Sequence, residues 1–472
     1  MTDHARAEWW RPDFEVASGP RSTPADAAKP QVSGSAVPYW AMMTFTFILL
    51  LAPQSFFPAL APFRIALLTG LAAITTYVFD KFTRGQPIIM RTREMRITAC
   101  LIAWVILTIP FSLRPGESLS FLFETYFKSL AIFWLLSHTV NTLPRLRQVA
   151  WALTLMTIPI TTTAINNFIA GRFIPGSDRI VGYEAALTGN PNGLALVLNL
   201  ILPLSTALFL VTRRPVVRTG LLMIIFLEVV AVILTFSRGG FLTLATTIAL
   251  YLWKFHKRHE GGWAVAGLVV ALICLPLVPS SYFDRVSTIL NKEADPTGSA
   301  QARWRDMVAA AKVTVQNPIV GVGLRMNALA LAEERGPDWD PMGRYLLDVH
   351  DVYLVYAAEL GIPGLVLFLM LLVSSMKSAI SVQTRSAGVP ALRELFYLAE
   401  GIQISLIAFA ISALFDPNAY DFYCYYFAGL ALAAKAAYEA ESSNTLDHQS
   451  TPQKPQASYL SKREFVYATK QG

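Results

Sequence analysis

One arginine stands in a sharp turn between two long apolar runs. The turn reads TFSRGG over residues 235–240, and its glycines permit backbone conformations that other residues avoid. The two adjoining helices are therefore expected to fix Arg238 in place. A planar, permanently charged guanidinium suits bidentate binding of a phosphate. The alternative is an arginine that only anchors a helix end at the membrane interface.

A histidine begins a later apolar run, DVHDVYLVYAAELGIPG at residues 348–364. Asp348 is expected to cap the helix, which places His350 in the first turn. The positive helix N-terminus disfavours imidazolium, so a neutral His350 could accept a proton from an attacking hydroxyl. The alternative is an interfacial polar residue without chemistry. Glu359 lies half a turn out of phase and is expected to find a partner inside the bundle, while Gly361 and Pro363 predict a bend.

Two further arginines flank Trp304 in ARWRDMVAAAKVTVQ, residues 302–316. This segment has good helix formers and is expected to end at Asn317, before a proline, with a second helix over about 325–335. On a helix, Arg303 and Arg305 point about 200° apart, so only one can easily face a given site. A solvated helix face is the alternative for either arginine.

Apolar runs must position these residues. About twelve runs are long enough to cross a bilayer as helices. They cover residues 38–53, 57–79, 96–112, 118–138, 147–169, 191–212, 217–236, 239–255, 263–280, 350–376, 394–415 and 420–440. The predicted fold is therefore an all-α integral membrane protein with about twelve transmembrane helices and one long outer helical loop, residues 281–349. An even number of spans places both termini on the same side of the membrane.

The charged residues of the short connections alternate between the two sides. One set of connections is rich in cations, which makes it cytoplasmic by the positive-inside rule. It holds Lys81, Arg84, Arg91, Arg93, Arg96, Arg145, Arg147, Arg213, Arg214, Arg218, Lys254, Lys257, Arg258, Lys377, Arg385 and Arg393. The outer set keeps only Arg172, Arg179, Arg238 and the cations of the loop before His350. Cations collected on the outer face predict the binding of an anion there.

Composition supports a membrane protein. Of the 472 residues 54% are hydrophobic and 15% charged, and the mean hydropathy is +0.45. The net charge of +7 fits loops that meet anionic lipid headgroups, so no nucleic acid is expected. The three cysteines show no metal or disulfide spacing, and no cleaved signal peptide is recognised. We predict a membrane domain over 38–441, with disordered cytoplasmic ends at 1–37 and 442–472.

Several motifs are missing from the sequence. It contains no Walker loop, no dinucleotide fingerprint and no outer carboxylate cluster, so no metal, ATP or nicotinamide cofactor is expected. Within the spans, Glu124 and Lys128 stand at i, i+4 and are expected to pair. Arg64 lies near the outer end of its span, where an ionisable group is a functional candidate by default.

Four segments together resemble the O-antigen ligase family, which includes polysaccharide polymerases of the Wzy type. They are GNPNGLALVLNLILPL at 189–204, LTFSRGGFLTLA at 234–245, SAQARWRDMVAAAKVTVQNPIVGVGL at 299–324 and HDVYLVYAAELGIPGLVLFL at 350–369. The resemblance covers about residues 185–370. Met307 stands where family members often have an aromatic residue, which leaves open whether Arg303 or Arg305 is the functional arginine. Asp351 replaces a common asparagine.

The resemblance implies an enzyme of the bacterial inner membrane with its active site on the periplasmic side. The donor would be a glycan on undecaprenyl diphosphate, and the acceptor either lipid A–core or another glycan. Arg238 and Arg303 would bind the diphosphate, and His350 would serve the acceptor hydroxyl. Arg305, Tyr353 and Arg64 are further candidates for substrate binding. Asn190 and Asn192 would either contact sugar hydroxyls or cap the following helix.

Three functions are compatible with this pattern. The first is an O-antigen ligase-like glycosyltransferase that works without a metal, because preorganised guanidinium groups can stabilise the departing phosphate. The second is a Wzy-type polymerase of O-antigen or exopolysaccharide repeat units, which differs only in the acceptor. The third is a flippase for lipid-linked glycans. A flippase should line a path at the bilayer midplane with charges, whereas the cations outside the basic connections here collect at the outer rim, which favours an enzyme.

Overall fold

The computed structural model describes residues 35–175, 179–185, 187–258, 299–335 and 348–450. These residues form helices, with one isolated bridge between Phe173 and Ile180. The α-helices are α1 (Ala36–Leu51), α2 (Pro53–Phe56), α3 (Ile65–Thr83), α4 (Arg93–Thr108), α5 (Pro115–Phe121), α6 (Phe127–Thr139), α7 (Leu143–Ile169), α8 (Pro191–Val211), α9 (Pro215–Leu234), α10 (Arg238–Lys257), α13 (Ser299–Gln316), α14 (Asn327–Arg335), α15 (Val352–Ser386), α16 (Arg393–Ser412) and α17 (Phe422–Ser450). Short 3₁₀ turns are η2 (Pro58–Phe63), η3 (Ile109–Phe111) and η7 (Pro390–Leu392), and η4 (Leu122–Tyr126) is a π-helix.

Eight helical segments of this described part are long and apolar enough to cross a membrane. The all-α, multi-pass architecture is confirmed, but the count of twelve spans is not. The helix α1 has only 16 residues, and α10 carries Arg238 near one end with Lys254 and Lys257 near the other. The predicted span 263–280 lies outside the described residues, and α17 continues to Ser450 instead of ending near residue 441.

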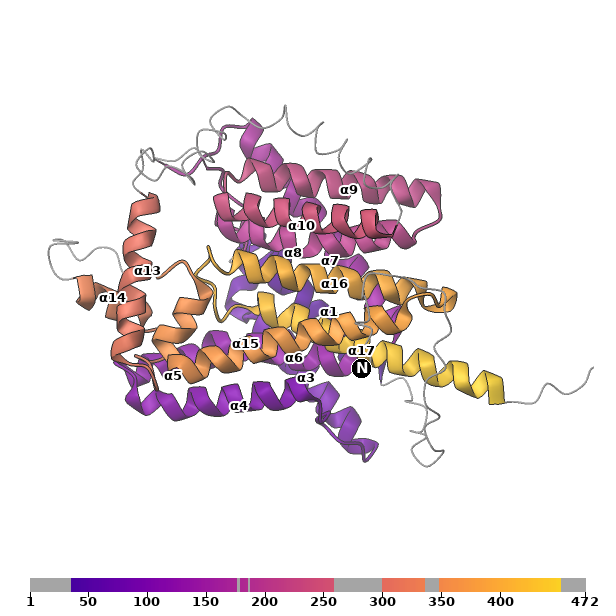
Figure 1. Cartoon of the computed structure of the whole chain (residues 1–472), viewed down its shortest axis with the longest axis horizontal. Helices are drawn as coiled ribbons and strands as arrows, with labels where there is room; N and C mark the ends of the chain where they lie inside the picture. The colour runs from indigo at the N-terminus through magenta and orange to yellow at the C-terminus, as the bar shows by residue number, and fades with distance from the viewer. Residues whose placement is uncertain (1–34, 176–178, 186, 259–298, 336–347, 451–472) are drawn as a thin grey trace, which may run out of the picture.

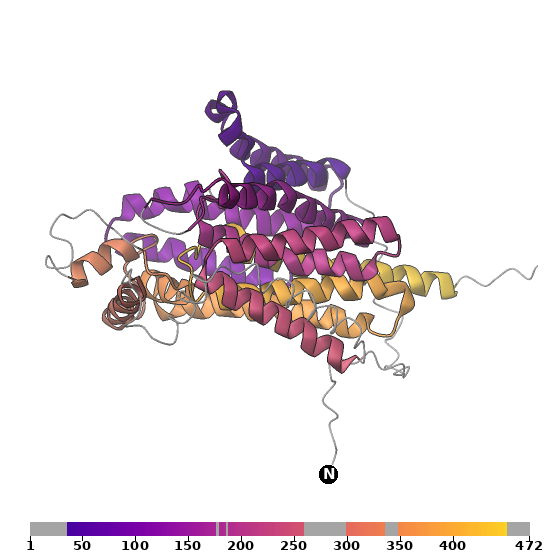
Figure 2. The same ribbon diagram turned by 90° about the horizontal axis from the view of Figure 1, so that it is seen from above.

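Two helices form the centre of the bundle. Within the apolar 18-residue stretch of each helix, 83% is buried in α16 extended by η7 and 78% in α8, but only 11% in α3. Figure 2 shows the indigo N-terminal helices at the edge of the bundle. In Figure 1, α13 and α14 lie at the left end, while α17 leaves the bundle at the right end. The left end therefore holds the outer segments expected to carry the site.

The π-helix η4 overturns one prediction. Its wider turn shifts the helix register between Glu124 and Lys128, and no ion pair joins these two exposed residues. The expected i, i+4 contact assumed regular α-helical geometry. Both side chains instead lie on the exposed surface of this span.

The predicted bend in α15 is confirmed at Gly361, where φ is +67° inside the helix. The bend frees backbone carbonyls, and the loop after α13 binds them: Val322 N–H donates to Ala358 O at 2.9 Å, and Gly323 N–H donates to Glu359 O at 3.0 Å. A Cβ at position 361 would lie 2.1 Å from the carbonyl oxygen of Ile319. The bend therefore anchors the loop that connects α13 with α14.

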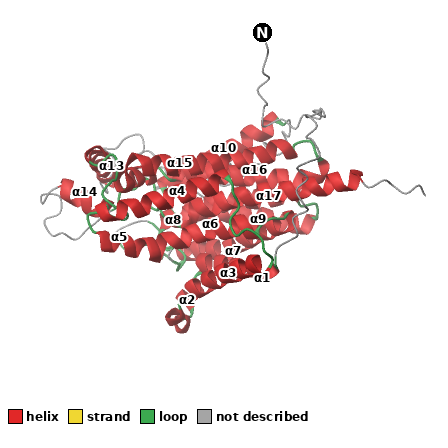
Figure 3. Ribbon diagram, turned by 90° about the horizontal axis from the view of Figure 1, so that it is seen from below, coloured by secondary structure: helices red, strands yellow, loops and turns green. Residues whose placement is uncertain are grey.

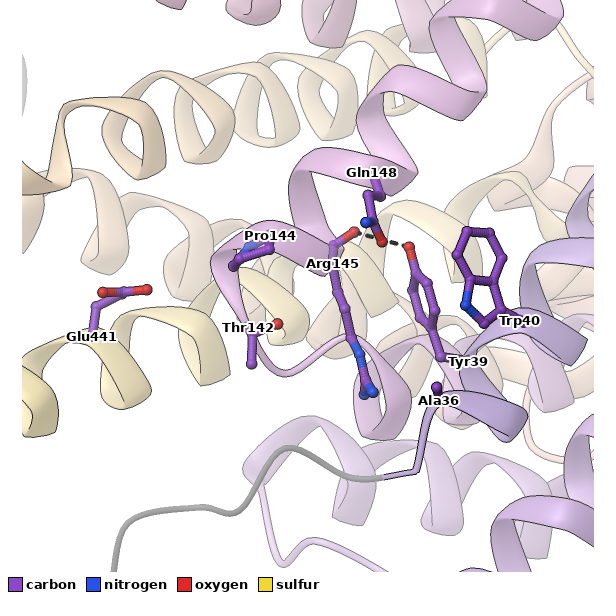
Figure 4. Close-up of a pocket in the computed structure, with 8 residues that line it drawn as sticks. All are labelled: Ala36, Tyr39, Trp40, Thr142, Pro144, Arg145, Gln148 and Glu441. Carbon is purple, nitrogen blue, oxygen red and sulfur yellow. Dashed lines mark hydrogen bonds between the residues drawn. The ribbon is translucent and has the colours of Figure 1, made fainter.

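A cavity of about 450 Å³ lies at the other end of α7 from the 170–190 loop, where α1 meets α7 (Figure 4). Its central cation is Arg145, which lies 5.0 Å above the ring of Tyr39 and donates to the Thr139 carbonyl at 2.8 Å. The hydroxyl of Tyr39 donates in turn to the carbonyl of Arg145 at 3.3 Å. These contacts fasten α1 to α7, so we assign the cavity to packing.

Candidate functional site

The turn around Arg238 is as tight as predicted, but its glycines serve a different purpose. Phe236, not a glycine, takes the left-handed conformation, with φ +53°. Gly239 and Gly240 are needed for close packing, because a Cβ would lie 2.7 Å from Cβ of Phe415 and 2.5 Å from Cβ of Ala195, respectively. The turn thus fixes Arg238, half-buried, in the first turn of α10.

The helix after His350 starts later than predicted. Its N-cap is Asp351, whose carboxylate accepts from the Leu354 N–H at 3.0 Å. Asp348 instead pairs with Arg325 at 2.7 Å. The prediction failed because either aspartate could cap a helix here, and Asp351 has the right spacing to the first free N–H groups. His350 therefore precedes the helix and stays outside its first turn.

His350 is held as a neutral base. Burial, helped by the positive charge of Arg303 and to a smaller extent that of Arg179, lowers the pKa of His350 to about 4 against the opposing effect of Asp348. Its Nδ1 lies 3.1 Å from the carbonyl oxygen of Asp348. Since a carbonyl only accepts, Nδ1 carries the proton and Nε2 keeps the lone pair. Nε2 can then accept a proton from a hydroxyl.

The same electrostatics distinguish the two loop arginines. Arg303 is half-buried on α13 and acts on both His350 and Asp416. Arg305 is exposed, and it is not among the groups that shift the pKa of His350 or that of Asp416. Both lie on α13 as predicted, and the helix ends at Gln316. Of the two loop arginines, Arg303 is therefore the one whose charge acts on His350.

Arg179 is a further cation of this site that sequence reasoning left without a role. Its Nη2 donates to Oδ1 of Asn192 at 2.5 Å, and Oγ of Ser237 donates to the same oxygen at 2.8 Å. Asn192 thereby joins the 170–190 loop to the turn that carries Arg238. Asn190 has the capping role that was one of its two alternatives, because its Oδ1 accepts from the Asn192 N–H at 2.8 Å.

The connection between α16 and α17 closes the cluster and was also missed. The Val352 N–H donates to the carbonyl of Ala413 at 2.8 Å, and Phe415 packs on Gly239. This connection therefore touches both the start of α15 and the turn of Arg238. It buries Asp416, whose pKa rises to about 7 because of burial, with Arg303 opposing the rise.

The remaining candidates lie apart or serve packing. The hydroxyl of Tyr353 donates to the Ala410 carbonyl at 2.7 Å, which ties α15 to α16. Glu359 is fully buried and accepts from the backbone N–H groups of Arg325 and Asn327 at 2.8 and 3.1 Å. Arg64 is exposed where η2 meets α3, and no contact described here joins it to His350. Figure 3 shows α2, just before it, projecting from the bundle.

Arg238, Arg303 and His350 all belong to one recognisable stretch of the chain. Residues 219–369 match the family model of the O-antigen ligase. This stretch is similar to O-antigen ligases. The family resemblance is thus confirmed, although the match starts later than the expected residue 185. Among curated proteins, none matches the chain.

The matched stretch extends from α9 through the bend of α15. Arg179, Asn192 and Asp416 lie outside the matched residues but contact or influence those inside. The site therefore combines cations suited to a polyanion with a neutral histidine that can take a proton. This pairing fits a transfer reaction in which a phosphate leaves and a hydroxyl attacks.

Proposed function

We propose that this protein is an O-antigen ligase-like glycosyltransferase of the bacterial inner membrane. It moves a glycan from undecaprenyl diphosphate to an acceptor hydroxyl at the periplasmic face. The observation that carries the proposal is the electrostatic coupling of Arg303 and Arg179 to a neutral, half-buried His350. Cations that keep a neighbouring histidine neutral supply both an anion site and a base within one cluster.

The donor diphosphate binds the arginines. Arg238 and Arg303 make charge-assisted hydrogen bonds to it, and Arg179, held by Asn192, contributes a further guanidinium. The bond between the anomeric carbon and the phosphate oxygen breaks, and negative charge grows on the departing diphosphate. Fixed guanidinium groups stabilise that charge as it develops, so the transfer is proposed to need no metal.

His350 serves the acceptor. The acceptor oxygen bonds to the anomeric carbon, and its proton passes to Nε2 of His350. The Asp348 carbonyl keeps the ring in the required tautomer, since it accepts from Nδ1. The imidazolium formed then releases the proton to solvent. Lipid A–core as acceptor makes the protein a ligase, and a second lipid-linked repeat unit makes it a polymerase.

Reconstitution tests this function. The purified full-length chain receives an undecaprenyl-diphosphate-linked glycan, with lipid A–core in one arm and excess donor alone in the other, both in EDTA. The proposal expects a longer glycan product in one of the two arms. A product with lipid A–core identifies a ligase, and a product with donor alone identifies a polymerase. Movement of donor across proteoliposomes without any product would instead indicate a flippase, and transfer that EDTA abolishes would contradict the metal-independent mechanism.

A further inference from the structure

A second cavity lies at the same end of the bundle and has a different chemistry. It has a volume of about 480 Å³ and opens between α5 and the start of α14, within the range of about 300–1,000 Å³ usual for ligand sites. The residues with charged side chains that line it are Arg114, Glu117, Glu124, Arg325 and Asp348. The lining thus carries two cations and three carboxylates, which disfavours a phosphate and suits the hydroxyl groups of a sugar.

One wall of this cavity is Arg325, which has an unusual backbone conformation and is fixed by three contacts. Its backbone takes the left-handed conformation with φ +65°, and its N–H donates to the buried Glu359 at 2.8 Å. The guanidinium donates to Asp348 at 2.7 Å and lies 5.6 Å from the centre of the Phe121 ring. A non-glycine residue in this conformation is a strained position, and such strain concentrates at functional sites.

The opposite wall is formed by α5 and the residues just before it, which are also held by hydrogen bonds. The Leu113 N–H donates to the Val322 carbonyl at 2.9 Å, and Oγ of Ser118 donates to the Leu324 carbonyl at 2.8 Å. On the exposed side of α5, Arg114 and Glu117 pair at 2.8 Å. Both walls therefore present charged donors and acceptors from a rigid backbone, which lowers the entropy lost when a polar ligand binds.

The cavity is connected to the proposed catalytic histidine through a single residue. Asp348 is one of the residues that line the cavity, and its carboxylate pairs with Arg325. Its backbone carbonyl is the group that lies 3.1 Å from Nδ1 of His350. A ligand that contacts Asp348 in the cavity is thus two residues from the base that would deprotonate an attacking hydroxyl.

We propose that this cavity is the sugar subsite of the acceptor. It binds a sugar residue of the acceptor glycan through Arg325, Glu117 and Asp348, and so presents the attacking hydroxyl to His350. The inference rests on the proposed function, and it deepens that function by separating the acceptor from the donor: the anion site uses Arg238, Arg303 and Arg179, whereas this site is mixed in charge.

A binding measurement tests the subsite without any transfer. The full-length chain in detergent is titrated with two lipid-free glycans, the core oligosaccharide released from lipopolysaccharide by mild acid and the repeat-unit glycan. Saturation-transfer NMR gives each Kd. Arg325→Gln should raise the Kd of the preferred glycan about tenfold and Glu117→Gln about fivefold, because each removes a charge-assisted hydrogen bond.

Two matched controls lie at the same end of the protein but outside this cavity. Arg172→Gln and Glu333→Gln remove an exposed charge each, and they should leave the Kd unchanged. An unchanged Kd in Arg325→Gln and Glu117→Gln, or no binding of either glycan to the wild type, would overturn the subsite. A wild type that binds a glycan at this cavity but transfers none would contradict the proposed function and support the sugar site.

Discussion

Oγ of Ser237 donates a hydrogen bond to Oδ1 of Asn192 at 2.8 Å. Ser237 caps the helix that begins with Arg238, and the same Asn192 oxygen holds Arg179. One amide thus joins the segment of Arg179 to the turn that carries Arg238. This link between two outer segments supports the proposal that both arginines serve one anion site.

Asn192→Ala should weaken donor binding about tenfold or more, because a shared acceptor for two site residues is lost. Donor binding to the purified chain is measured with a fluorescent lipid-linked glycan. Asn190→Ala is the matched control. It removes the cap of α8 and should cost about 1 kcal/mol of stability while donor affinity stays unchanged. Equal donor affinity in both variants would show that Asn192 has no role in the anion site.

Arg303→Ala should abolish transfer at normal expression, whereas Arg305→Ala should be mild. Arg303 acts on His350, while Arg305 is exposed on another face of α13. Arg238→Lys should recover little activity, because a lysine cannot make the bidentate contact. Radiolabel transfer in EDTA is the assay. The reverse result, with Arg305→Ala inactive and Arg303→Ala active, would show that Arg305 and not Arg303 is the arginine needed for transfer.

The pH profile should reveal the neighbours of His350. Its pKa is about 4, so kcat/KM should fall only as the pH approaches that value, well below the ordinary histidine value of 6.5. Removing a nearby cation raises this pKa, so Arg179→Gln should move the acid limb to higher pH. Burial, with a contribution from Asp421, raises the pKa of Asp416 to about 7. Because the titration of Asp416 would add a limb of its own to the profile, the variants are compared in an Asp416→Asn background. An acid limb of kcat/KM at the same pH in Arg179→Gln and in the wild type would contradict the assigned effect of Arg179 on the pKa of His350.

Part of this arrangement follows from sequence and part does not. The bend at Gly361 and the helices α13 and α14 follow from local signals, because prolines, glycines and helix formers act over short distances. The position of Arg179 depends on Asn192, and Phe415, the neighbour of buried Asp416, packs against Gly239. Such contacts join distant segments, and no local pattern encodes them.

The errors in the prediction have equally local causes. Two aspartates close together offered alternative caps, and the structure uses Asp351. The turn around Arg238 contains two glycines just after the arginine, yet Phe236 takes the positive φ, because the glycines are needed where helices approach closely. The π-helix η4, which contains Glu124 and ends before Lys128, adds a residue to one turn, and the expected i, i+4 contact assumed a regular α-helix. Each error concerns geometry within a correctly recognised element.

The orientation of the bundle makes its own prediction. A cysteine at exposed Gln301, at the start of α13, should react with a membrane-impermeant thiol reagent in cells whose outer membrane is permeabilised, once Cys100, Cys274 and Cys424 are replaced. A cysteine at exposed Gln86, in the basic connection before α4, should react only after the inner membrane is opened. The opposite pattern would place Arg303 and His350 on the cytoplasmic side and remove the proposed donor from their reach.

The rate of glycan transfer by His350→Ala is the most direct test of the central claim. The variant is assayed in EDTA with saturating lipid-linked donor, and donor binding is measured on the same preparation. The account predicts that donor affinity remains within about twofold of wild type while the transfer rate falls by about 10²–10⁴-fold, the usual effect of losing a well-placed general base. Transfer at a near-wild-type rate would contradict the role of His350 as the base.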